Sequence, residues 1–427
     1  MSTDPGPATV EAMTSESPSP PDPTSAPRIQ VVVVGAGPVG LVAALAAHSH
    51  GLRTTILEAE DSNRLRPGSR ATYLYRETLD QLDAFSPGLG ARLAREGVTW
   101  PRIRSTYHGR TVYERTFPRA PHGAFGASIS QRLQERAMLE HVEKAGIPIR
   151  LSSRVGSVSS TENGVTVHLV DGSTIDADYV VAADGAHSAV RTSLGIGMEG
   201  PRSDASFVIV DVDEVADDPL PLVREFHYRH PAVEGRNVLV LPFQGGWRLD
   251  LQARRDDDVE ALQSADGTAA WVAAILGERY RDRIAWVSRY RFHRAVAARF
   301  TDPHNRVFLA GEAAHLFAPF GGGRGLNSGV RDAQAAIEAF AAAARDGGDA
   351  AAREQVGAAG ETRRRAGHFN ADAAGGALAQ MEANTVFDRA AQWGAAFAAR
   401  WWSRPGMWLD SRVTSGSAER FSPSTRF

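Results

Sequence analysis

The chain has 427 residues, of which 43% are hydrophobic and 23% charged, as is typical of a soluble globular protein with one large core or two. Its net charge of −3 gives no general attraction to nucleic acid or to anionic membranes, and no run of about 20 apolar residues predicts a transmembrane helix. Cysteine is absent, which excludes disulfides and thiolate catalysis, and no other metal ligands cluster at a recognisable spacing, so we expect no metal site.

The N-terminal segment 1–28 is rich in Pro, Ser and Thr and holds too few apolar side chains to fold, so we expect a disordered tail. It does not resemble a signal peptide, because Asp4 and Glu11 replace the basic start and no apolar stretch follows. A cytoplasmic location is the resulting expectation.

A strand–helix–strand pattern follows the tail. The apolar run Val31–Val34 predicts a buried parallel strand, Leu41–His48 predicts a helix that Gly51 ends, and Thr54–Leu57 predicts a second buried strand. Between the first strand and the helix, three glycines have the spacing G-x-G-x-x-G, and they are Gly35, Gly37 and Gly40.

Each glycine of this pattern has a separate physical role. Gly35 permits a tight turn, Gly37 lets a pyrophosphate approach the backbone, and Gly40 lets the helix pack on the strand. The helix N-terminus offers free N–H groups to phosphates, and Glu58, which lies 23 positions after Gly35, can accept both ribose hydroxyls of an adenosine. The pattern predicts a dinucleotide site, against the alternative of a glycine-rich structural turn.

The next segment starts with a polar, Arg-rich loop that ends near Arg70, for which contact with a dinucleotide and simple solvation are both open interpretations. The patterns then predict a helix at Tyr73–Phe85, strands within Trp100–Phe125, and a loop entering a helix at Ser128–Leu139. A short antiparallel set with a turn at Asp171-Gly172 follows, and its predicted strands are Ile147–Leu151, Ser157–Ser159, Val165–Leu169 and Thr174–Ala177.

A further buried strand, Tyr179–Ala183, runs into Asp184-Gly185 and then into a short helical segment. This order places the Asp184 carboxylate at the carboxyl edge of a parallel sheet, where ligands bind in such folds.

Four strand-like runs with polar turns then predict an antiparallel sheet in a second domain. They are Phe207–Glu214, Leu222–His230, Asn237–Pro242 and Trp247–Ala253, followed by a helix at Thr268–Leu276 and a strand at Ile284–Phe292. By the two-residue period of a strand, one face carries Arg224, Phe226, Tyr228 and His230. That face could roof a pocket, or it could be an ordinary half-exposed strand.

A third motif follows the predicted strand Arg306–Ala310. It comprises Gly311-Glu312, His315, Pro319 and the segment Gly321–Gly329, where five of nine residues are glycine, and the helix Val330–Arg345 comes next. So many glycines before a helix leave backbone N–H groups open to a planar or anionic group. The remainder, Ala350–Trp402, is largely helical, and Arg412–Phe427 is expected to fray.

Together these three motifs resemble the FAD-dependent aromatic hydroxylases, single-component flavoprotein monooxygenases similar to p-hydroxybenzoate hydroxylase, over roughly Gln30–Ala350. The resemblance implies an α/β fold, with a Rossmann-like FAD-binding domain of parallel strands and helices, an antiparallel-sheet substrate domain and C-terminal helices. The implied domain ranges are 29–105, 126–200 and 290–350 for FAD, 106–125 and 201–289 for the substrate, and 351–427 for the helices and tail.

The resemblance also assigns residues to the cofactor. Arg70 and Asp184 would lie near the pyrophosphate, Gln131 would contact the flavin's linker, and Pro319 would lie beside the isoalloxazine ring. The full set implied to bind FAD is Gly35, Gly37, Pro38, Val39, Gly40, Glu58, Ala59, Arg70, Gln131, Asp184, Gly311, Glu312, Pro319, Gly322, Gly323, Gly325, Leu326 and Asn327.

One position departs from the family pattern, which usually has Gly-Asp where this chain has Gly311-Glu312. The acid would accept a hydrogen bond from the ribityl chain. Glutamate keeps the charge but adds a methylene, so the backbone or a water must adjust.

In such enzymes NADPH or NADH reduces the flavin transiently, and O2 then gives a flavin hydroperoxide that transfers oxygen to the substrate. The implied partners are therefore O2 and a small aromatic or polycyclic substrate, with no nucleic acid or membrane. A base that deprotonates a phenol would assist, and His227, Tyr228 and His230 are the candidates, while His315 is expected to be structural or adjacent to the flavin.

Several alternatives stay open at this point. Epoxidation, oxidative decarboxylation or Baeyer–Villiger oxidation of a natural product would use the same scaffold, and a redox-silent FAD-binding protein would carry the same motifs. The sequence also leaves open whether the chain is a monomer or a homodimer.

Overall fold

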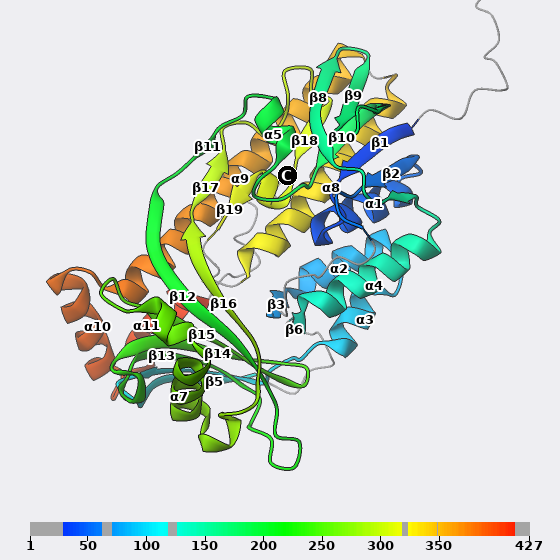
Figure 1. Cartoon of the computed structure of the whole chain (residues 1–427). Helices are drawn as coiled ribbons and strands as arrows, with labels where there is room; N and C mark the ends of the chain where they lie inside the picture. The colour runs from blue at the N-terminus through cyan, green and yellow to red at the C-terminus, as the bar shows by residue number, and fades with distance from the viewer. Residues whose placement is uncertain (1–28, 62–70, 118–125, 318–322, 348, 415–427) are drawn as a thin grey trace, which may run out of the picture.

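The computed structural model describes residues 29–61, 71–117, 126–317, 323–347 and 349–414. Figure 1 shows two regions of sheet, joined by long curved strands and flanked by helices. The predicted tail 1–28, the loop up to Arg70, and Pro319 and Gly322 of the third motif lie outside the described residues.

The predicted strand–helix–strand unit is confirmed. It consists of β1 (Ile29–Val34), α1 (Pro38–Ser49) and the parallel strand β2 (Thr54–Leu57). Most of its apolar side chains are buried, among them Val31, Leu41 and Ile56, and α1 packs against the later helices α4 (Gln131–Lys144) and α8 (Arg324–Arg345). Two glycines predicted to shape the unit have positive φ, Gly35 at 98° and Gly51 at 74°.

The first sheet has seven strands in the described part of the chain, with β18 beside β10 and the others in the order β7-β2-β1-β10-β9-β8. Its remaining strands are β7 (Ile149–Arg150), β8 (Val155–Thr161), β9 (Gly164–Leu169), β10 (Thr174–Ala182) and β18 (Val307–Leu309). The prediction that Ile147–Leu151 joins the antiparallel set was wrong, because β7 pairs in parallel with β2.

A single strand, β10, replaces the two strands predicted at Thr174–Ala177 and Tyr179–Ala183. Its first half pairs antiparallel with β9, and its second half lies parallel to β1 and β18. The burial pattern changes at the same point, from alternating to continuous, which is why the sequence suggested two elements.

The predicted helix Tyr73–Phe85 begins later than expected. β3 (Ala71–Leu74) pairs antiparallel with β6 (Ala127–Ser130), a segment predicted as loop, and the helix α2 starts only at Arg76 and ends at Phe85. Pairing between strands that are far apart in the sequence outweighs the local helix propensity here. Helix α3 (Leu89–Glu96) and α4 pack next to this pair.

The second sheet also has seven strands among the described residues, in the order β16-β12-β15-β14-β13-β4-β5. They are β4 (Arg102–Tyr107), β5 (Arg110–Thr116), β12 (Arg202–Asp213), β13 (Val223–His230), β14 (Arg236–Phe243), β15 (Gly246–Ala253) and β16 (Ile284–His293). The four predicted runs are confirmed, but the sheet is mixed rather than purely antiparallel, because β13 and β4 are parallel.

The two faces of this sheet have different environments. Val208, Leu249 and Trp271 belong to an outer cluster under helix α7 (Ala265–Leu276), which follows the short α6 (Val259–Gln263). Phe207 and Phe226, on the opposite face, belong to the main core that is shared with the first sheet. We call this second side the inner face.

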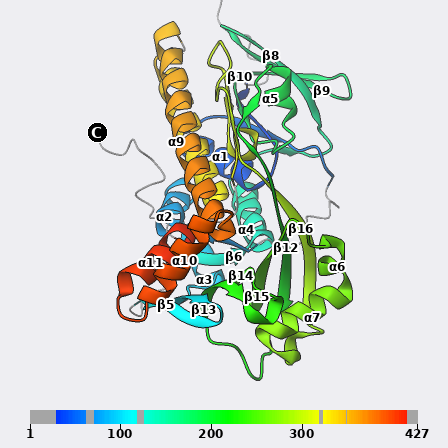
Figure 2. The same ribbon diagram turned by 90° about the vertical axis from the view of Figure 1, so that its left-hand side faces the viewer.

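The glycine-rich third motif is partly helical. Helix α8 starts at Arg324, six residues before the predicted start, so Gly325, Leu326 and Asn327 lie in its first turn. Helices α9 (Ala350–Glu382), α10 (Val386–Ala398) and α11 (Ser403–Thr414) follow, and Figure 2 shows the long α9 passing beside both sheets. The short elements that complete the fold are α5 (Ala189–Ser193), β11 (Met198–Glu199), β17 (Ala295–Ala297), β19 (His315–Leu316) and the 3-10 turns Pro231–Val233, Glu278–Tyr280 and Gly311–Ala313.

A buried carboxylate links the third motif to the helices. Asp332 of α8 is fully buried and accepts hydrogen bonds from the Gly311 backbone N–H at 3.1 Å, from His315 Nε2 at 2.6 Å and from Arg363 Nε at 2.8 Å. Burial alone would raise the pKa of Asp332, but the charges and hydrogen bonds of His315 and Arg363 outweigh it and lower that pKa. His315 is thus a structural partner, as expected.

Replacing Asp332 with Asn should lower the free energy of unfolding at pH 7 by about 3 to 5 kcal/mol, because Arg363 is left buried without its counter-charge. A lowered folded-state pKa gives stability that is present above the ordinary carboxyl value of about 4 and is lost as the pH falls through the folded-state value. The difference between wild type and variant should therefore shrink below about pH 4.

Urea unfolding at pH 7 and at acidic pH measures this difference. Asp372→Asn, on an 81% exposed side chain, is the control and should change little. Equal stability of the Asp332 variant and the wild type at pH 7 would contradict the assignment.

Candidate dinucleotide site

The first glycine loop lies at the carboxyl end of β1, where its three glycines have different surroundings. A Cβ added at Gly35 or Gly40 would collide with a backbone carbonyl, that of Ala183 or of Gly35 respectively. A Cβ at Gly37 would meet nothing within 4 Å. Gly35 and Gly40 are therefore required by the fold, whereas Gly37 borders open space.

Glu58, directly after β2, is 6% exposed and holds this loop in place. Its Oε2 accepts a hydrogen bond from the Ala36 N–H at 2.8 Å, and its Oε1 accepts one from the Glu60 N–H at 3.0 Å. The acid predicted to bind the ribose thus lies against the glycine loop, with Ala59 next to it.

The first and third motifs touch through Val39. Pro38 and Val39 form the start of α1, and the Val39 side chain occupies the space next to Gly311 and Gly329, where added Cβ atoms would meet it at 2.9 Å and closer. Gly311 has φ of 63°, in the left-handed region. Glycine is needed at both positions so that the two helices can approach.

The second motif lies between the other two. Asp184 follows β10, its Oδ2 accepts the Val190 N–H at 3.1 Å, and its Oδ1 is buried without a hydrogen-bond partner among the described residues. The buried Arg191, on α5, donates to the Ala313 carbonyl at 3.1 Å. Burial lowers the pKa of Arg191, although the charge of Asp184 opposes this shift.

The third motif contributes the first turn of α8 and the turn at Glu312. Glu312 is exposed at the carboxyl end of β18. Gly323 precedes the helix with φ of 66° and lies close to the Tyr73 carbonyl, while a Cβ at Gly325 would meet nothing within 4 Å. Leu326 is half-buried beside it.

Asn327 is buried, and its side chain has internal partners. Its Oδ1 accepts from the Tyr75 N–H at 3.1 Å and from the Thr78 hydroxyl at 2.7 Å, and its Nδ2 donates to the Tyr73 carbonyl at 2.7 Å. Asn327 therefore fixes α8 against β3 and α2. The remaining predicted contact, Gln131, begins α4 and donates to Glu135 at 2.8 Å.

The three motifs meet, because β1, β10 and β18 are neighbouring parallel strands and their carboxyl ends share one edge of the sheet. Space is open around Gly37, Gly185 and Gly325, and the buried Asp184 Oδ1 offers an acceptor there. Helices α1 and α8 have their N-termini at Pro38 and Arg324. These features fit a dinucleotide such as FAD, with phosphates at the first helix and the ring system near the second.

The three candidate bases do not all lie together, because the His227 and His230 rings are 4.9 Å apart whereas Tyr228 lies on the inner face. His227 bonds to the Thr106 hydroxyl at 2.9 Å and to Glu225 at 3.1 Å, and Glu225 pairs with Val240 of the outer cluster. On the inner face, the Tyr228 hydroxyl donates to the Leu409 carbonyl at 2.8 Å, and burial raises the pKa of Tyr228 above its usual range.

His230 is displaced from the face predicted for it. The register shifts between His227 and His230, and Arg229 between them has φ of 50°. Burial and, secondarily, the charge of His227 lower the pKa of His230 to about 4, so its ring is neutral at pH 7. Of the four predicted side chains, Arg224, Phe226 and Tyr228 remain together on the inner face.

A polar cluster on the inner face was not predicted. Arg248 donates from Nε to Asp250 Oδ1 at 2.7 Å, and Asp211 lies opposite Arg248 on the neighbouring strand, all three being at most 6% exposed. The signal was in the sequence, since charged residues at alternate positions of a strand predicted to be half-buried share one face.

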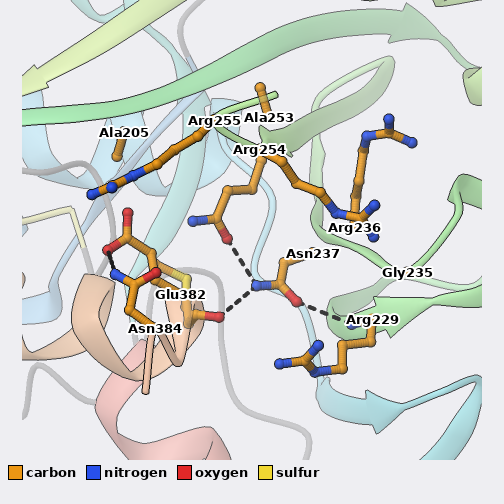
Figure 3. Close-up of a pocket in the computed structure, with 12 residues that line it drawn as sticks. Ala205, Arg229, Gly235, Arg236, Asn237, Ala253, Arg254, Arg255, Glu382 and Asn384 are labelled. Atoms are coloured by element: carbon orange, nitrogen blue, oxygen red, sulfur yellow. Dashed lines mark hydrogen bonds between the residues drawn. The ribbon is translucent and has the colours of Figure 1, made fainter. Parts of the chain in front are cut away.

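Figure 3 shows a separate polar cavity, of about 380 Å³, where β14 and β15 meet the end of α9. Arg229, Arg236, Arg254 and Arg255 line it, and Asn237 Nδ2 donates to Gln252 and to the Met381 carbonyl at 2.8 Å each. None of its lining residues belongs to the three dinucleotide motifs.

Within the described ranges, no three His, Asp or Glu side chains are grouped so that they could hold a metal ion. The helices of that same part of the chain are too short or too polar to cross a bilayer.

Comparison with known proteins identifies the family. The sequence matches the FAD binding domain family over residues 28–368. It is 28% identical over 323 residues to rifampicin monooxygenase of Streptomyces venezuelae, covering 71% of this chain but 62% of that one. It is 29% identical over 328 residues to para-nitrophenol 4-monooxygenase of Pseudomonas sp., covering 74% of this chain and 79% of that one.

A solved structure supports the fold. p-Nitrophenol 4-monooxygenase from Pseudomonas putida superposes with a TM-score of 0.69 at 24% identity, covering 92% of this chain and 95% of that one. The chain belongs to the FAD-binding family of the FAD-dependent aromatic hydroxylases, which confirms the resemblance seen in the motifs. Its cofactor is FAD.

Replacing Gly325 with Val should weaken FAD binding at least about tenfold, because the added side chain would occupy the open space proposed for the cofactor. The fold should not be destabilised, since nothing lies within 4 Å of the Cβ position and Val has a higher helix propensity than Gly. Gly376→Val is the matched control, since this helical glycine of α9 also has nothing within 4 Å of its Cβ position. Flavin titration measures the affinity, and unchanged affinity of the Gly325 variant would remove this turn from the site.

Proposed function

We propose that the protein is an FAD-dependent monooxygenase that consumes NADH or NADPH and inserts one oxygen atom of O2 into an aromatic or polycyclic phenolic substrate. The observation that supports this proposal most directly is that three dinucleotide motifs converge on one edge of the first sheet. The inner face of the second sheet shares the main core with the first sheet. The names of the relatives support this reaction class, since rifampicin and para-nitrophenol are substrates of monooxygenases similar to this chain.

The chain's own residues have defined tasks in this proposal. Glu58 accepts the ribose hydroxyls, the N–H groups at the start of α1 bind the pyrophosphate, and the buried Asp184 Oδ1 accepts a hydrogen bond from a hydroxyl group of the cofactor. The N–H groups of Gly325 and Leu326, in the first turn of α8, meet the flavin ring. When bound, FAD supplies electron transfer from the nicotinamide and activation of O2.

Arg248 and Asp250 are the substrate anchors in this proposal. Arg248 is buried on the inner face with its guanidinium fixed by Asp250, so it can meet a phenolate or carboxylate oxygen without being reoriented. A buried guanidinium held in place favours an acidic or phenolic group on the substrate. Tyr228 and His227, which are bonded to Leu409 and Glu225, are weaker candidates for contact with the substrate.

The proposal extends to domain limits and location. The FAD-binding domain comprises 29–105, 126–200 and 290–350, and the substrate domain comprises 106–125 and 201–289. The strands β4 and β16 of the second sheet cross these limits by a few residues. The location is the cytoplasm, where NADH and NADPH are available.

An absorbance and stopped-flow experiment tests the function. The purified protein is loaded with FAD, mixed anaerobically with NADH or NADPH, and then exposed to O2 together with phenolic acids and polycyclic phenols. Flavin reduction that one phenol accelerates, with a hydroxylated product equal to the nicotinamide consumed, is the expected result. A flavin that neither nicotinamide reduces would overturn the proposal in favour of a redox-silent FAD-binding role.

Replacing Asp250 with Asn should raise KM for the phenolic substrate by roughly tenfold to a hundredfold, because Arg248 loses a charge-assisted hydrogen bond that orients it. FAD content and the thermal midpoint are recorded alongside, so that a folding defect is recognised. Asp213→Asn, at the exposed end of β12, is the control. An unchanged KM in the Asp250 variant would take the cluster out of the substrate site.

A further inference from the structure

Large apolar side chains are exposed on α10 and α11 to an unusual degree. Of the eleven exposed large hydrophobic residues in the described chain, seven lie between positions 386 and 407. They are Val386 (72% exposed), Phe387 (86%), Trp393 (61%), Phe397 (44%), Trp401 (61%), Trp402 (65%) and Met407 (48%). Figure 2 shows the helices that carry them at the outer side of the molecule.

Four of these side chains are linked by successive ring contacts. Trp393 stacks on Phe397 at 5.5 Å between ring centroids, Phe397 meets Trp401 edge-on at 5.0 Å, and Trp401 lies 6.3 Å from Trp402. We call the surface formed by Val386, Phe387, Trp393, Phe397 and Trp401 the α10 stripe.

Helix geometry explains why the stripe is exposed. At about 100° per residue, Val386, Phe387, Trp393 and Phe397 fall in one sector of α10 about 120° wide, and Trp401 follows the end of this helix at Ala398. The same sector also contains Ala390 and Gly394. The opposite side packs inward, since Gln392 is 1% exposed and Ala395 and Ala396 contact the main core. The sector holds no charged residue.

The composition of the surface is that of a protein interface. From Arg389 to Leu409 the chain contains no Lys, Asp or Glu, and its only charges are Arg389, Arg400 and Arg404. Trp, Phe, Met and Arg are enriched in the centres of protein–protein interfaces, whereas Lys, Asp and Glu are depleted. Arg400 already lies over the Phe397 ring at 5.2 Å, which shows that these arginines can pair with the aromatic side chains.

The exposed area matches half of a stable dimer. An aromatic side chain buries roughly 150 to 250 Å², so the four aromatic residues of the stripe leave roughly 400 to 600 Å² uncovered, and the adjoining Trp402 adds roughly 100 to 160 Å². The largest apolar patch on a typical monomer is about 300 to 600 Å², and each partner of a standard interface buries about 800 Å². We propose that the α10 stripe is the interface of a homodimer in which the two stripes pack on each other across a two-fold axis.

A second copy fits this surface better than a lipid bilayer does. Sequences that bind anionic lipid carry clusters of about four to eight basic residues, whereas this one has three, and the whole chain has a net charge of −3. Each copy also offers both the arginine and the aromatic ring that pair with each other, so the surface is complementary to itself. The stripe is apolar at all times and therefore needs a partner that is always available. A second copy of the chain is available wherever the chain is produced.

The interface would support the substrate domain. Helix α11 packs against α10 and carries Leu409 and Asp410. Leu409 accepts the Tyr228 hydroxyl, and Asp410 accepts from the Ser105 hydroxyl at 2.7 Å and from Arg224 at 3.3 Å. A partner on α10 would hold α11 against β13 and β4. The dimer does not depend on the proposed reaction.

Sedimentation velocity of the FAD-loaded full chain tests the proposal. We expect a particle of twice the 45.8 kDa of one chain at micromolar concentration. Trp393→Ser combined with Trp401→Ser should weaken the dimer at least about a hundredfold, since a central tryptophan accounts for roughly thirtyfold. Val170→Ser, on a 67% exposed side chain of the first domain, is the control and should leave the dimer intact.

A cross-link locates the axis even if the double variant does not fold. The chain has no cysteine, Gly394 lies near the middle of the stripe, and nothing lies within 4 Å of its Cβ position. Gly394→Cys should therefore form an intermolecular disulfide on mild oxidation, whereas Ala391→Cys, on the same helix but outside the stripe, should not.

Other results would overturn the proposal. They are a monomeric wild type, a dimer that the double variant leaves intact, a monomer that sediments with vesicles of phosphatidylserine, and a monomer that dimerises only after removal of 415–427. The last two would assign the stripe to a lipid surface or to the chain's own C-terminus.

Discussion

The buried carboxylate of Asp332 is the interaction on which the cofactor site depends. It accepts from the Gly311 backbone, from His315 and from Arg363, and so joins the end of β18 to α8 and α9. Without it, the turn that carries Glu312 would lose its fixed position relative to the first turn of α8. A charge buried this deeply is tolerated because the Arg363 guanidinium, the His315 ring and a backbone N–H compensate it.

Close approach of backbones is the second constraint, and it explains which glycines serve the fold and which border a ligand. Val39 fills the space left by Gly311 and Gly329, so the first and third motifs lie against each other. Gly37 and Gly325 have nothing near their Cβ positions and are therefore the glycines that we propose to face the cofactor. A glycine motif in a sequence does not distinguish these two uses.

The sequence predicted the parts of the molecule that follow local rules. The parallel strand β1, helix α1, Glu58 and the position of Asp184 came from apolar runs and glycine spacing, and the structure brings them to one edge. The pairing of β3 with β6 and the parallel contact of β13 with β4 were missed, because both join segments far apart in the chain. The prediction placed His230 on the wrong face of β13, because no local sequence pattern indicates the register shift before it.

The strands of the cofactor edge are separated widely along the chain, and this has a consequence for biosynthesis. β1 begins at Ile29, β10 ends at Ala182 and β18 ends at Leu309, yet the three lie side by side. Contacts over such separations form late in folding, and the ribosome delivers the chain from its N-terminus. In the proposed site, the part formed by β1 and α1 is therefore synthesised long before the part formed by α8. A chain interrupted before α8 would leave uncovered the face of α1 that packs on α8.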